Sequence, residues 1–335
     1  MKRVKIGNRW VGEGEPCFII AEAGSNHSGK IEQALQLIDV AVDAGADAVK
    51  FQVYSADTLY SEHSEAFSII KSIETPRAWL RQLADYAHNK GILFFATPFD
   101  REAVDQLEQV GVPCYKWASL ELVNHPLLRY AAAKGRPMIL STGVSDLADI
   151  QEAINVVYAE GNHDILLLHC ASLFEYPQKP RQVNLRMMDT LKAAFGLPVG
   201  FSDHTLSTAI PAAAAGRGAC IIEKHFTLDR RLPGPDHGFA LEPAELRDMV
   251  KAIRDVEASL GSPKKEAIAE EERVLEQRPS IIARVDIPAG TVITDTMIIT
   301  KRPGFGIAPK FFSVVLGRKA RKDIQKGQGV TWDAI

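Results

Sequence analysis

The sequence predicts an α/β chain that begins with a large parallel-strand barrel and ends with a small, mostly β module. Eight short apolar runs alternate with helical patterns from residue 18 to about residue 262. The runs are continuously apolar, which is typical of parallel strands covered on both faces. Eight such units in about 245 residues match the size of a (β/α)8 TIM barrel. A doubly wound open sheet is the alternative, although no Gly-x-Gly-x-x-Gly turn follows the first strand.

The elements follow one another regularly along the chain. The expected strands are Phe18–Ala23, Ala48–Val53, Leu93–Thr97, Cys114–Ala118, Met138–Ser141, Ile165–His169, Val199–Ser202 and Cys220–His225. The clearest helical stretches between and after them are Ile31–Ala44, Arg77–Lys90, Arg101–Gln109, Leu147–Ala159, Thr208–Gly216 and Pro243–Leu260. Such strict alternation favours a single barrel over separate helical and strand domains.

The pattern changes after residue 262. We expect a barrel domain over residues 1–262, a linker rich in Lys, Glu and Ala over 263–279, and a second domain over 280–335. Short strands with Gly and Pro turns are expected in this second domain, at residues 281–284, 286–292 and 323–327. A module of about 55 residues is marginal alone and should dock on something larger.

Composition excludes several classes of function. The 335 residues carry a net charge of only -3, which gives no electrostatic reason to bind nucleic acid or an anionic membrane. No apolar run is long enough to span a membrane, and the N-terminal residues lack the apolar core of a signal peptide. We therefore expect a cytoplasmic protein. The four cysteines are scattered in apolar runs and are read as reduced core residues.

Polar residues follow nearly every predicted strand, where a TIM barrel builds its active site. They are Glu22, Asn26, His27, Lys50, Gln52, Thr97, Lys116, Ser119, Ser141, Thr142, Ser172, Ser202, Asp203, His204, Glu223, Lys224 and His225. His204 and His225 end consecutive strands and could hold one divalent metal with an open coordination side. Lys50 and Lys116, with the hydroxyl groups around them, suit a phosphorylated anion. Rim lysines paired with neighbouring carboxylates, and histidines unrelated to any metal, are the structural alternatives.

Several of these segments form a specific motif set. The run from Ile20 to Gly29 resembles the opening signature of the sialic acid synthase family, and the remaining family motifs follow in the expected order. These motifs are residues 49–52, 97–99, 115–116, 140–143, 201–205 and 223–227. The C-terminal module resembles the antifreeze-like SAF domain, with residues 301–304 matching its arginine segment. The resemblance covers nearly the whole chain.

The resemblance implies an enzyme that condenses phosphoenolpyruvate with an open-chain N-acetylated amino sugar. The products would be a nonulosonic acid, of the sialic, legionaminic or pseudaminic type, and phosphate. It also implies a divalent metal, Mn²⁺ with Mg²⁺ or Co²⁺ as alternatives, on His204 and His225. As partners it implies the two substrates and a second copy of the chain in a domain-swapped homodimer. Arg302 would then reach the partner subunit's sugar site.

The family pattern implies roles for several of these positions, and further candidates complete the expected site. Glu22 would be the main acid/base carboxylate, with Glu223 and Asp203 as further catalytic candidates. Phosphoenolpyruvate would be held by Lys50, Thr97, Lys116, Ser119, Ser141 and Ser202. The other substrate-binding candidates are Gln52, Glu121, Ser172, Tyr176, Asp236 and Arg302. Glu22 could instead be an ion-pair partner of a lysine, and Glu223 could orient a neighbour or form an ion pair.

Two segments, residues 54–75 and 170–180, depart from the family pattern, and loops of this kind set substrate specificity. The sugar is therefore left open. A related 3-deoxy-ulosonate synthase that uses a phosphosugar is the second enzyme hypothesis. A carbohydrate- or ice-binding protein on an inactive barrel is the third, suggested only by the antifreeze-like module.

Overall fold

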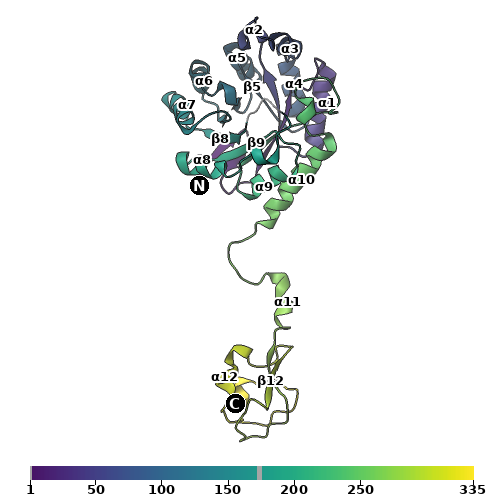
Figure 1. Cartoon of the computed structure of the whole chain (residues 1–335), viewed down its shortest axis with the longest axis vertical. Helices are drawn as coiled ribbons and strands as arrows, with labels where there is room; N and C mark the ends of the chain where they lie inside the picture. The colour runs from purple at the N-terminus through teal and green to yellow at the C-terminus, as the bar shows by residue number, and fades with distance from the viewer. Residues whose placement is uncertain (1, 172–175) are drawn as a thin grey trace. The chain divides into compact units, whose positions relative to one another are not determined.

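The computed structural model describes residues 2–171 and 176–335 of the chain. The chain divides after Gly261 into two compact units, a large N-terminal one and a small one from Ser262 to Ile335 (Figure 1). Each unit encloses its own hydrophobic core. Among the described residues, no helix combines the length and the apolar character needed to cross a membrane.

The first unit is built around one parallel sheet that curls into a barrel. Around the barrel the strands follow one another in chain order, and β10 pairs with β3, so the sheet turns back on its first strand. This pairing excludes the open doubly wound alternative and confirms the TIM barrel. The strands are β3 (Phe18–Gly24), β4 (Ala48–Val53), β5 (Leu93–Pro98), β6 (Tyr115–Trp117), β7 (Met138–Ser141), β8 (Ile165–Cys170), β9 (Val199–Asp203) and β10 (Ile221–His225). In the described part of the chain, the hydrogen-bond ladder is interrupted only between β5 and β6.

Helices cover the outside of this barrel, as parallel strands with two apolar faces require (Figure 1). The main ones are α1 (Ile31–Asp43), α4 (Leu80–Asn89), α5 (Arg101–Val110), α6 (His125–Ala132), α7 (Leu147–Ala159), α8 (Met187–Phe195), α9 (Ala209–Gly216) and α10 (Pro243–Ser259). Capping side chains fix the start of two of these helices. The Asp100 side chain accepts from the Ala103 N–H at the start of α5, and Asp146 caps α7 in the same way. Two of these helices, α6 and α8, were not among the clearest sequence patterns.

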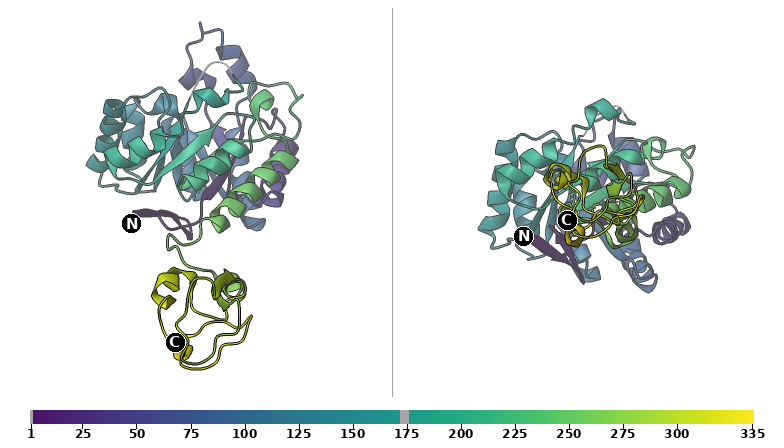
Figure 2. Two further views of the ribbon diagram at one scale, coloured as in Figure 1. Left: turned by 60° about the horizontal axis from the view of Figure 1, so that its bottom comes forward. Right: turned by 90° about the horizontal axis from the view of Figure 1, so that it is seen from below.

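A hairpin that the sequence did not predict precedes the barrel. Strands β1 (Arg3–Ile6) and β2 (Arg9–Gly12) pair antiparallel, and Val4, Ile6 and Val11 are buried in the barrel's core cluster. The hairpin turn at Gly7 lies against Leu93, at the amino end of β5. Figure 2 (left) shows the hairpin beside the N label at one end of the barrel. It therefore closes the end opposite to the strand ends that carry the polar residues.

Short elements follow the strands at the carboxyl end. They are α2 (Ala56–Leu59), α3 (Phe67–Ser72) and the single 3-10 turns at Arg77–Trp79, Ser119–Glu121, Pro180–Gln182 and His237–Phe239. In Figure 2 (left) the blue segment that holds α2 and α3 projects at the end away from the hairpin. This segment is one of the two that departed from the family pattern.

The second unit is small and has little regular structure. Its elements are α11 (Glu272–Leu275), β11 (Ser280–Ala283), β12 (Ile298–Lys301), α12 (Phe312–Val315) and 3-10 turns at Ala269–Glu271, Pro309–Phe311 and Trp332–Ala334. The expected strand at residue 281 is present and pairs with β12, which the sequence did not predict. The expected strands at residues 286–292 and 323–327 were wrong, because these segments make only isolated bridges, one of them joining Ile287 to Ile324.

Candidate active site

A cavity of about 380 Å³ opens at the carboxyl ends of the barrel strands. Fourteen of the seventeen residues that were given a catalytic, substrate-binding or metal-binding role line it. They are Glu22, Lys50, Gln52, Thr97, Lys116, Ser119, Glu121, Ser141, Tyr176, Ser202, His204, Glu223, His225 and Asp236. Parallel strands deliver their last residues to one edge, so residues far apart in the chain meet here.

Two lysines and two carboxylates form the floor of this cavity. The Lys50 Nζ lies 2.6 Å from the Glu22 Oε2 and 3.8 Å from the Glu223 Oε2. The Lys116 Nζ lies 3.2 Å from the other oxygen of Glu223. All four side chains are buried, so each charge depends on the others to offset its loss of hydration. We call these four residues the charged floor.

The two carboxyl groups of the charged floor differ in proton affinity. Burial raises the pKa of Glu22, against the opposing effect of Lys50. Burial acts in the same direction on Glu223, but Lys116 and Lys50 outweigh it and lower the pKa of that carboxyl. Glu22 is therefore the carboxyl of the pair that takes up a proton more readily, which is the usual arrangement when two neighbouring carboxyls have different roles.

Hydroxyl and amide groups surround the charged floor. The Lys50 Nζ donates to the Thr97 Oγ1 at 3.1 Å, and the Gln52 amide donates to Glu22 at 2.9 Å. The Ser202 hydroxyl donates to the Glu223 Oε1 at 3.1 Å. On the β6–β7 side, the Ser119 and Ser141 hydroxyls are bonded at 2.9 Å. These donors face one small space and could be redirected to an anion bound there.

His204 and His225 lie side by side next to the floor, with ring centroids 5.2 Å apart. The Nδ1 of His225 is buried and has no hydrogen-bond partner. Burial and the neighbouring His204 hold the pKa of His225 well below its usual value, so its ring is neutral and can donate a lone pair. Two adjacent imidazoles with an unused nitrogen fit a divalent cation. The described residues contain no cluster of three or more potential metal-binding side chains, so such an ion would depend on water or substrate for its other ligands.

Asp236 enters the same space beside Gly24, the last residue of β3. The β3–β4 register shifts between Glu22 and Gly24, and Gly24 adopts a positive φ of 53°. A Cβ on Gly24 would lie 2.8 Å from the Asp236 Oδ2, so only glycine allows this approach. Burial raises the pKa of Asp236. The glycine of the opening motif therefore makes room for a carboxyl from the β10–α10 loop.

Two predicted site residues, Asp203 and Arg302, lie elsewhere. Asp203 is fully buried outside the cavity lining, where it pairs with the Lys224 Nζ at 2.5 Å and accepts from the Thr205 N–H. This position corrects its expected catalytic role, because an ion-paired carboxylate behind His204 can position the strand end but cannot contact a substrate. Ser172 lies outside the described residues.

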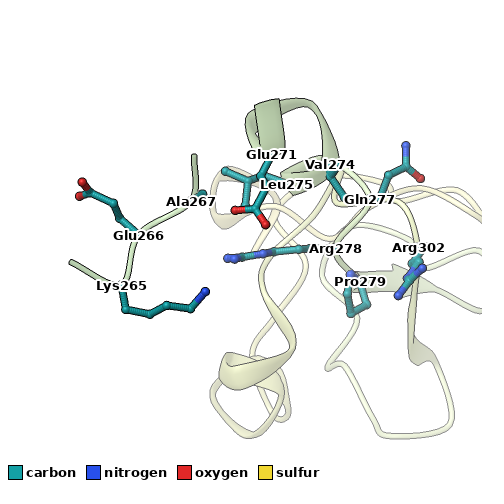
Figure 3. Close-up of a pocket in the computed structure, with 10 residues that line it drawn as sticks. All are labelled: Lys265, Glu266, Ala267, Glu271, Val274, Leu275, Gln277, Arg278, Pro279 and Arg302. Carbon is teal, nitrogen blue, oxygen red and sulfur yellow. The ribbon is translucent and has the colours of Figure 1, made fainter. Parts of the chain in front are cut away.

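Arg302 belongs to the second unit. It is exposed at the end of β12 and lines a hollow of about 550 Å³ together with Arg278, Glu271 and Pro279. Figure 3 shows Arg302 beside Pro279, with the side chains of Arg278 and Glu271 directed into the same hollow. The second unit therefore presents the guanidinium of Arg302 on its surface.

The sequence missed the apolar part of the barrel cavity. Leu59, Tyr60, Ile70 and Ile73 line it from the α2–α3 segment, and Leu120 lines it from the turn after β6. Phe239 also lines it and stacks on Tyr176, with ring centroids 4.5 Å apart. An apolar residue on a short helix has no sequence signal that separates it from a core residue, so only the structure could identify this wall.

Comparisons with known proteins agree with the motif set. The NeuB family matches residues 37–265, and the SAF domain matches residues 278–335. The chain is 44% identical to an uncharacterised protein of Methanocaldococcus jannaschii, over 100% of this chain and 99% of that protein. It is 41% identical to the N,N'-diacetyllegionaminic acid synthase of Legionella pneumophila, over 97% of this chain and 96% of that protein.

A solved structure matches at similar identity. The N-acetylneuraminic acid synthetase of Leptospira borgpetersenii, crystallised with citrate, superimposes with a TM-score of 0.77 at 38% identity. The match covers 82% of this chain and 95% of that chain. The fold, the order of the motifs and these matches lead to one conclusion: the chain belongs to the NeuB family and ends in a SAF domain.

Proposed function

We propose that the protein condenses phosphoenolpyruvate with an open-chain N-acetylated amino sugar to give a nonulosonic acid and phosphate. The charged floor carries this proposal, since it places Lys50 and Lys116 on either side of Glu223 and beside a histidine pair. Two ammonium groups with several hydroxyl donors suit the phosphate and carboxylate of one small anion. Relatives named as legionaminic and pseudaminic acid synthases support the product class.

The reaction needs few groups from the protein. Lys50 and Lys116 exchange part of their pairing with Glu22 and Glu223 for the anion, which fixes the enol carbon in the cavity. When bound on His204 and His225, a divalent cation supplies Lewis acidity toward the sugar aldehyde. The enol carbon forms a bond to the aldehyde carbon, and water adds to the carbon that carries the phosphate. Cleavage of the C–O bond of that intermediate releases phosphate.

Glu22 is the residue we assign to the proton transfers. Its raised pKa lets it hold or release a proton near the charged floor, while Glu223 stays ionised between the two lysines. Replacement of Glu22 by Gln keeps its shape and its bond from Gln52 but removes the titrating group. We expect phosphoenolpyruvate binding to persist in Glu22→Gln while turnover falls by roughly a hundredfold or more.

The test is phosphate release from phosphoenolpyruvate with a panel of sugars, with mass analysis of the product. The panel contains N-acetylmannosamine, its 6-phosphate and the two diacetamido-trideoxyhexoses, each with Mn²⁺, Mg²⁺ or Co²⁺. Release that depends on an unphosphorylated sugar and yields a nine-carbon acid supports the proposal. Turnover of the 6-phosphate alone would favour a nonulosonic acid 9-phosphate as the product, as the name of the human relative, an N-acetylneuraminate-9-phosphate synthase, describes. No release with any sugar of the panel would contradict the proposed condensation.

We also propose a homodimer in which Arg302 of one chain completes the sugar site of the other. The second unit is small enough to be only marginally stable by itself. Arg302 and Phe305 are exposed on one of its loops. Mixing Arg302→Ala with Glu22→Ala protein under subunit exchange tests this arrangement. Mixed dimers would then hold one site with both residues intact, so activity should return. If each chain uses its own Arg302, every site keeps one defect and mixing restores nothing.

A further inference from the structure

A buried histidine follows Asp236 directly in the chain. His237 is 1% exposed and begins the 3-10 turn His237–Phe239, whereas Asp236, one residue earlier, lines the barrel cavity. In the described part of the chain, His237 itself does not line that cavity, so its ring is buried behind the cavity wall. A buried polar ring needs hydrogen-bond partners, and the partners of this ring show what it holds together.

Both ring nitrogens of His237 are bonded, each to a hydroxyl group of a different segment. The Nδ1 lies 2.6 Å from the Thr227 Oγ1, just after β10, and the Nε2 lies 3.2 Å from the Ser28 Oγ, just after β3. The Thr227 hydroxyl donates to the Asp229 carbonyl, so the Nδ1 carries the proton and donates to Thr227. Ser28 accepts from the Gln33 amide at 3.2 Å, so its own hydroxyl donates to the Nε2. The ring therefore joins the segments that follow the first and the last strand of the barrel.

The backbone on both sides is shaped around this ring. Gly234 has a φ of 152°, and a Cβ there would lie 2.8 Å from the His237 Cδ2, so only glycine allows the loop to pass the ring. Ser28 has a positive φ of 48°, which is uncommon for a residue with a side chain and persists only where its surroundings require it. The bond to His237 is one such requirement. Burial lowers the pKa of His237, which favours the neutral ring that these bonds need.

We infer that His237 is a positioning residue: its ring joins the β3–α1 loop to the β10–α10 loop and thereby fixes the carboxyl group of Asp236 in the cavity. The position of this carboxyl has little tolerance, because a Cβ on Gly24 would already lie 2.8 Å from the Asp236 Oδ2. A loop released from His237 would carry the carboxyl away from this place. Under the proposed function, on which this inference rests, Asp236 contacts the sugar, so its displacement would weaken sugar binding and leave phosphoenolpyruvate binding intact.

A pair of variants at Thr227 tests the bond without changing the ring. Thr227→Val keeps the shape of the side chain but removes the acceptor of the His237 Nδ1–H, whereas Thr227→Ser keeps the hydroxyl group. We expect kcat/KM for the sugar to fall by roughly tenfold to a hundredfold in Thr227→Val, mainly through KM, because a shift of about 1 Å in a positioning group can cost that much. The KM for phosphoenolpyruvate should change little, and Thr227→Ser should behave like the wild type. Equal loss in both variants, or a larger change for phosphoenolpyruvate, would overturn the inference.

A double-mutant cycle shows whether the histidine acts through the carboxyl group. His237→Asn and Asp236→Asn should each raise the KM for the sugar, and the double variant should be no worse than Asp236→Asn alone, because coupled residues do not contribute additively. Fully additive losses would overturn the inference. Asn162→Ala is the control for general destabilisation, because the buried Asn162 amide donates to the Ala132 and Arg136 carbonyls at the amino end of the barrel. A similar rise in the sugar KM in this control would assign the effect to lost stability.

Hydrogen–deuterium exchange gives a measurement that needs no turnover. The Ala240 N–H donates to the His237 carbonyl at 3.2 Å, so amides of the β10–α10 loop report on how firmly the loop is held. Thr227→Val should speed exchange over residues 229–241, and the serine variant should not. Unchanged exchange in the valine variant would overturn the inference whatever the kinetic constants show. If the wild type turned over no sugar of the panel, the proposed function would fall, and the exchange result alone would decide whether His237 fixes the loop.

Discussion

The charged floor and the apolar wall of the same cavity, formed by Leu59, Tyr60, Ile70 and Ile73 and here called the apolar rim, are built in opposite ways. The floor uses strand ends, where Glu22, Lys50, Lys116 and Glu223 are at most 5% exposed and held in mutual ion pairs. The rim uses short helices between strands, where side chains such as Tyr60 remain partly exposed. A barrel can therefore keep its reaction while its loops change the substrate.

Two ion pairs make the same contrast. Asp203 and Lys224, behind the floor, are 2.5 Å apart and both side chains are 0% exposed. Asp57 and Lys71, on the rim segment, are 2.6 Å apart, with side chains 59% and 47% exposed. The two ion pairs thus have nearly equal distances but very different exposure to solvent. Only the buried pair should matter to folding, because exposed pairs are screened by water and salt.

The largest expected effect is at the histidine pair. His204→Ala or His225→Ala should lower turnover by roughly a thousandfold, since the electrophilic contact to the sugar aldehyde is lost. The folded structure should persist, because these strand-end side chains add little core packing. Metal analysis of the purified variants should show reduced Mn²⁺ content. Near-wild-type activity after chelator treatment would place the metal elsewhere or remove it from the mechanism.

The buried ion pair gives the next effect, on stability instead of turnover. Lys224→Met removes the partner of Asp203 and leaves its carboxylate buried without a counter-charge. Loss of one partner of a buried pair costs about 3–5 kcal/mol. Chemical denaturation should show a loss of this order. A double variant, Asp203→Leu with Lys224→Met, should recover part of it, and no recovery would mean that packing rather than charge explains the loss.

The β3–α1 loop should make stability depend on pH. His27 accepts the Gly29 N–H at its Nδ1, and its Nε2 bonds with Thr75 at 2.9 Å, so the ring is held neutral. Burial, with a smaller contribution from His237, lowers the pKa of His27 to about 4. Between pH 6.5 and 4 the unfolded chain binds more protons, so stability falls as pH falls through this window.

The size of this pH effect and its control follow directly. The pKa of His27 differs by about 2.5 between the unfolded and the folded chain, which corresponds to about 3 kcal/mol in the free energy of unfolding. This contribution is fully present above pH 6.5 and is lost by about pH 4. Denaturation of the wild-type protein and of His27→Gln at pH 7.5, 6, 5 and 4 measures it. The variant should have a shallower slope over this range. An unchanged slope would assign the pH dependence to other buried groups, such as His169.

At the charged floor, Lys116→Ala should weaken the binding of one substrate, phosphoenolpyruvate. Loss of a charge-assisted contact of about 1.5–3 kcal/mol corresponds to roughly a tenfold to hundredfold rise in the KM for phosphoenolpyruvate. The KM for the sugar should change much less. Steady-state kinetics with each substrate varied in turn measure the two constants. A larger change in the sugar constant would reassign Lys116 to the sugar site.

The smallest effect is expected on the rim. Lys71→Met removes the exposed pair with Asp57, and the denaturation midpoint should not move beyond experimental error. This variant is the surface counterpart of Lys224→Met. A clear loss of stability would mean that the rim segment depends on its ion pair and would weaken the contrast between floor and rim.

The sequence predicted the floor well because strand ends leave a direct signal. A polar residue that ends a buried apolar run must lie at the carboxyl end of its strand. Lys50, Lys116 and both histidines could therefore be assigned to one cavity. The same reasoning misplaced Asp203, because successive residues of a strand point to opposite sides and His204, one position on, is the residue that faces the cavity. Contact with a specific partner, Lys224, was not visible in the pattern.

The rim and the second unit could not be predicted in the same way. Ile70 and Ile73 have the spacing of an ordinary amphipathic helix, and their partner is a cavity rather than a core. In the second unit, strand β12 packs on β11, whereas the segment with the clearer strand pattern, residues 286–292, makes isolated bridges only. With so few residues in this unit, tertiary pairing decides which segment becomes a strand.

The interrupted ladder between β5 and β6 has a further consequence. Lys50 on β4 and Thr97 on β5 lie on one side of this interruption, and Lys116 on β6 lies on the other. An anion bound by both lysines would therefore connect the two sides. Ligand affinity and closure of the barrel are then thermodynamically linked. Saturation with phosphoenolpyruvate should slow hydrogen–deuterium exchange in Tyr115–Trp117, far more than in the continuously paired strands on the opposite side of the barrel.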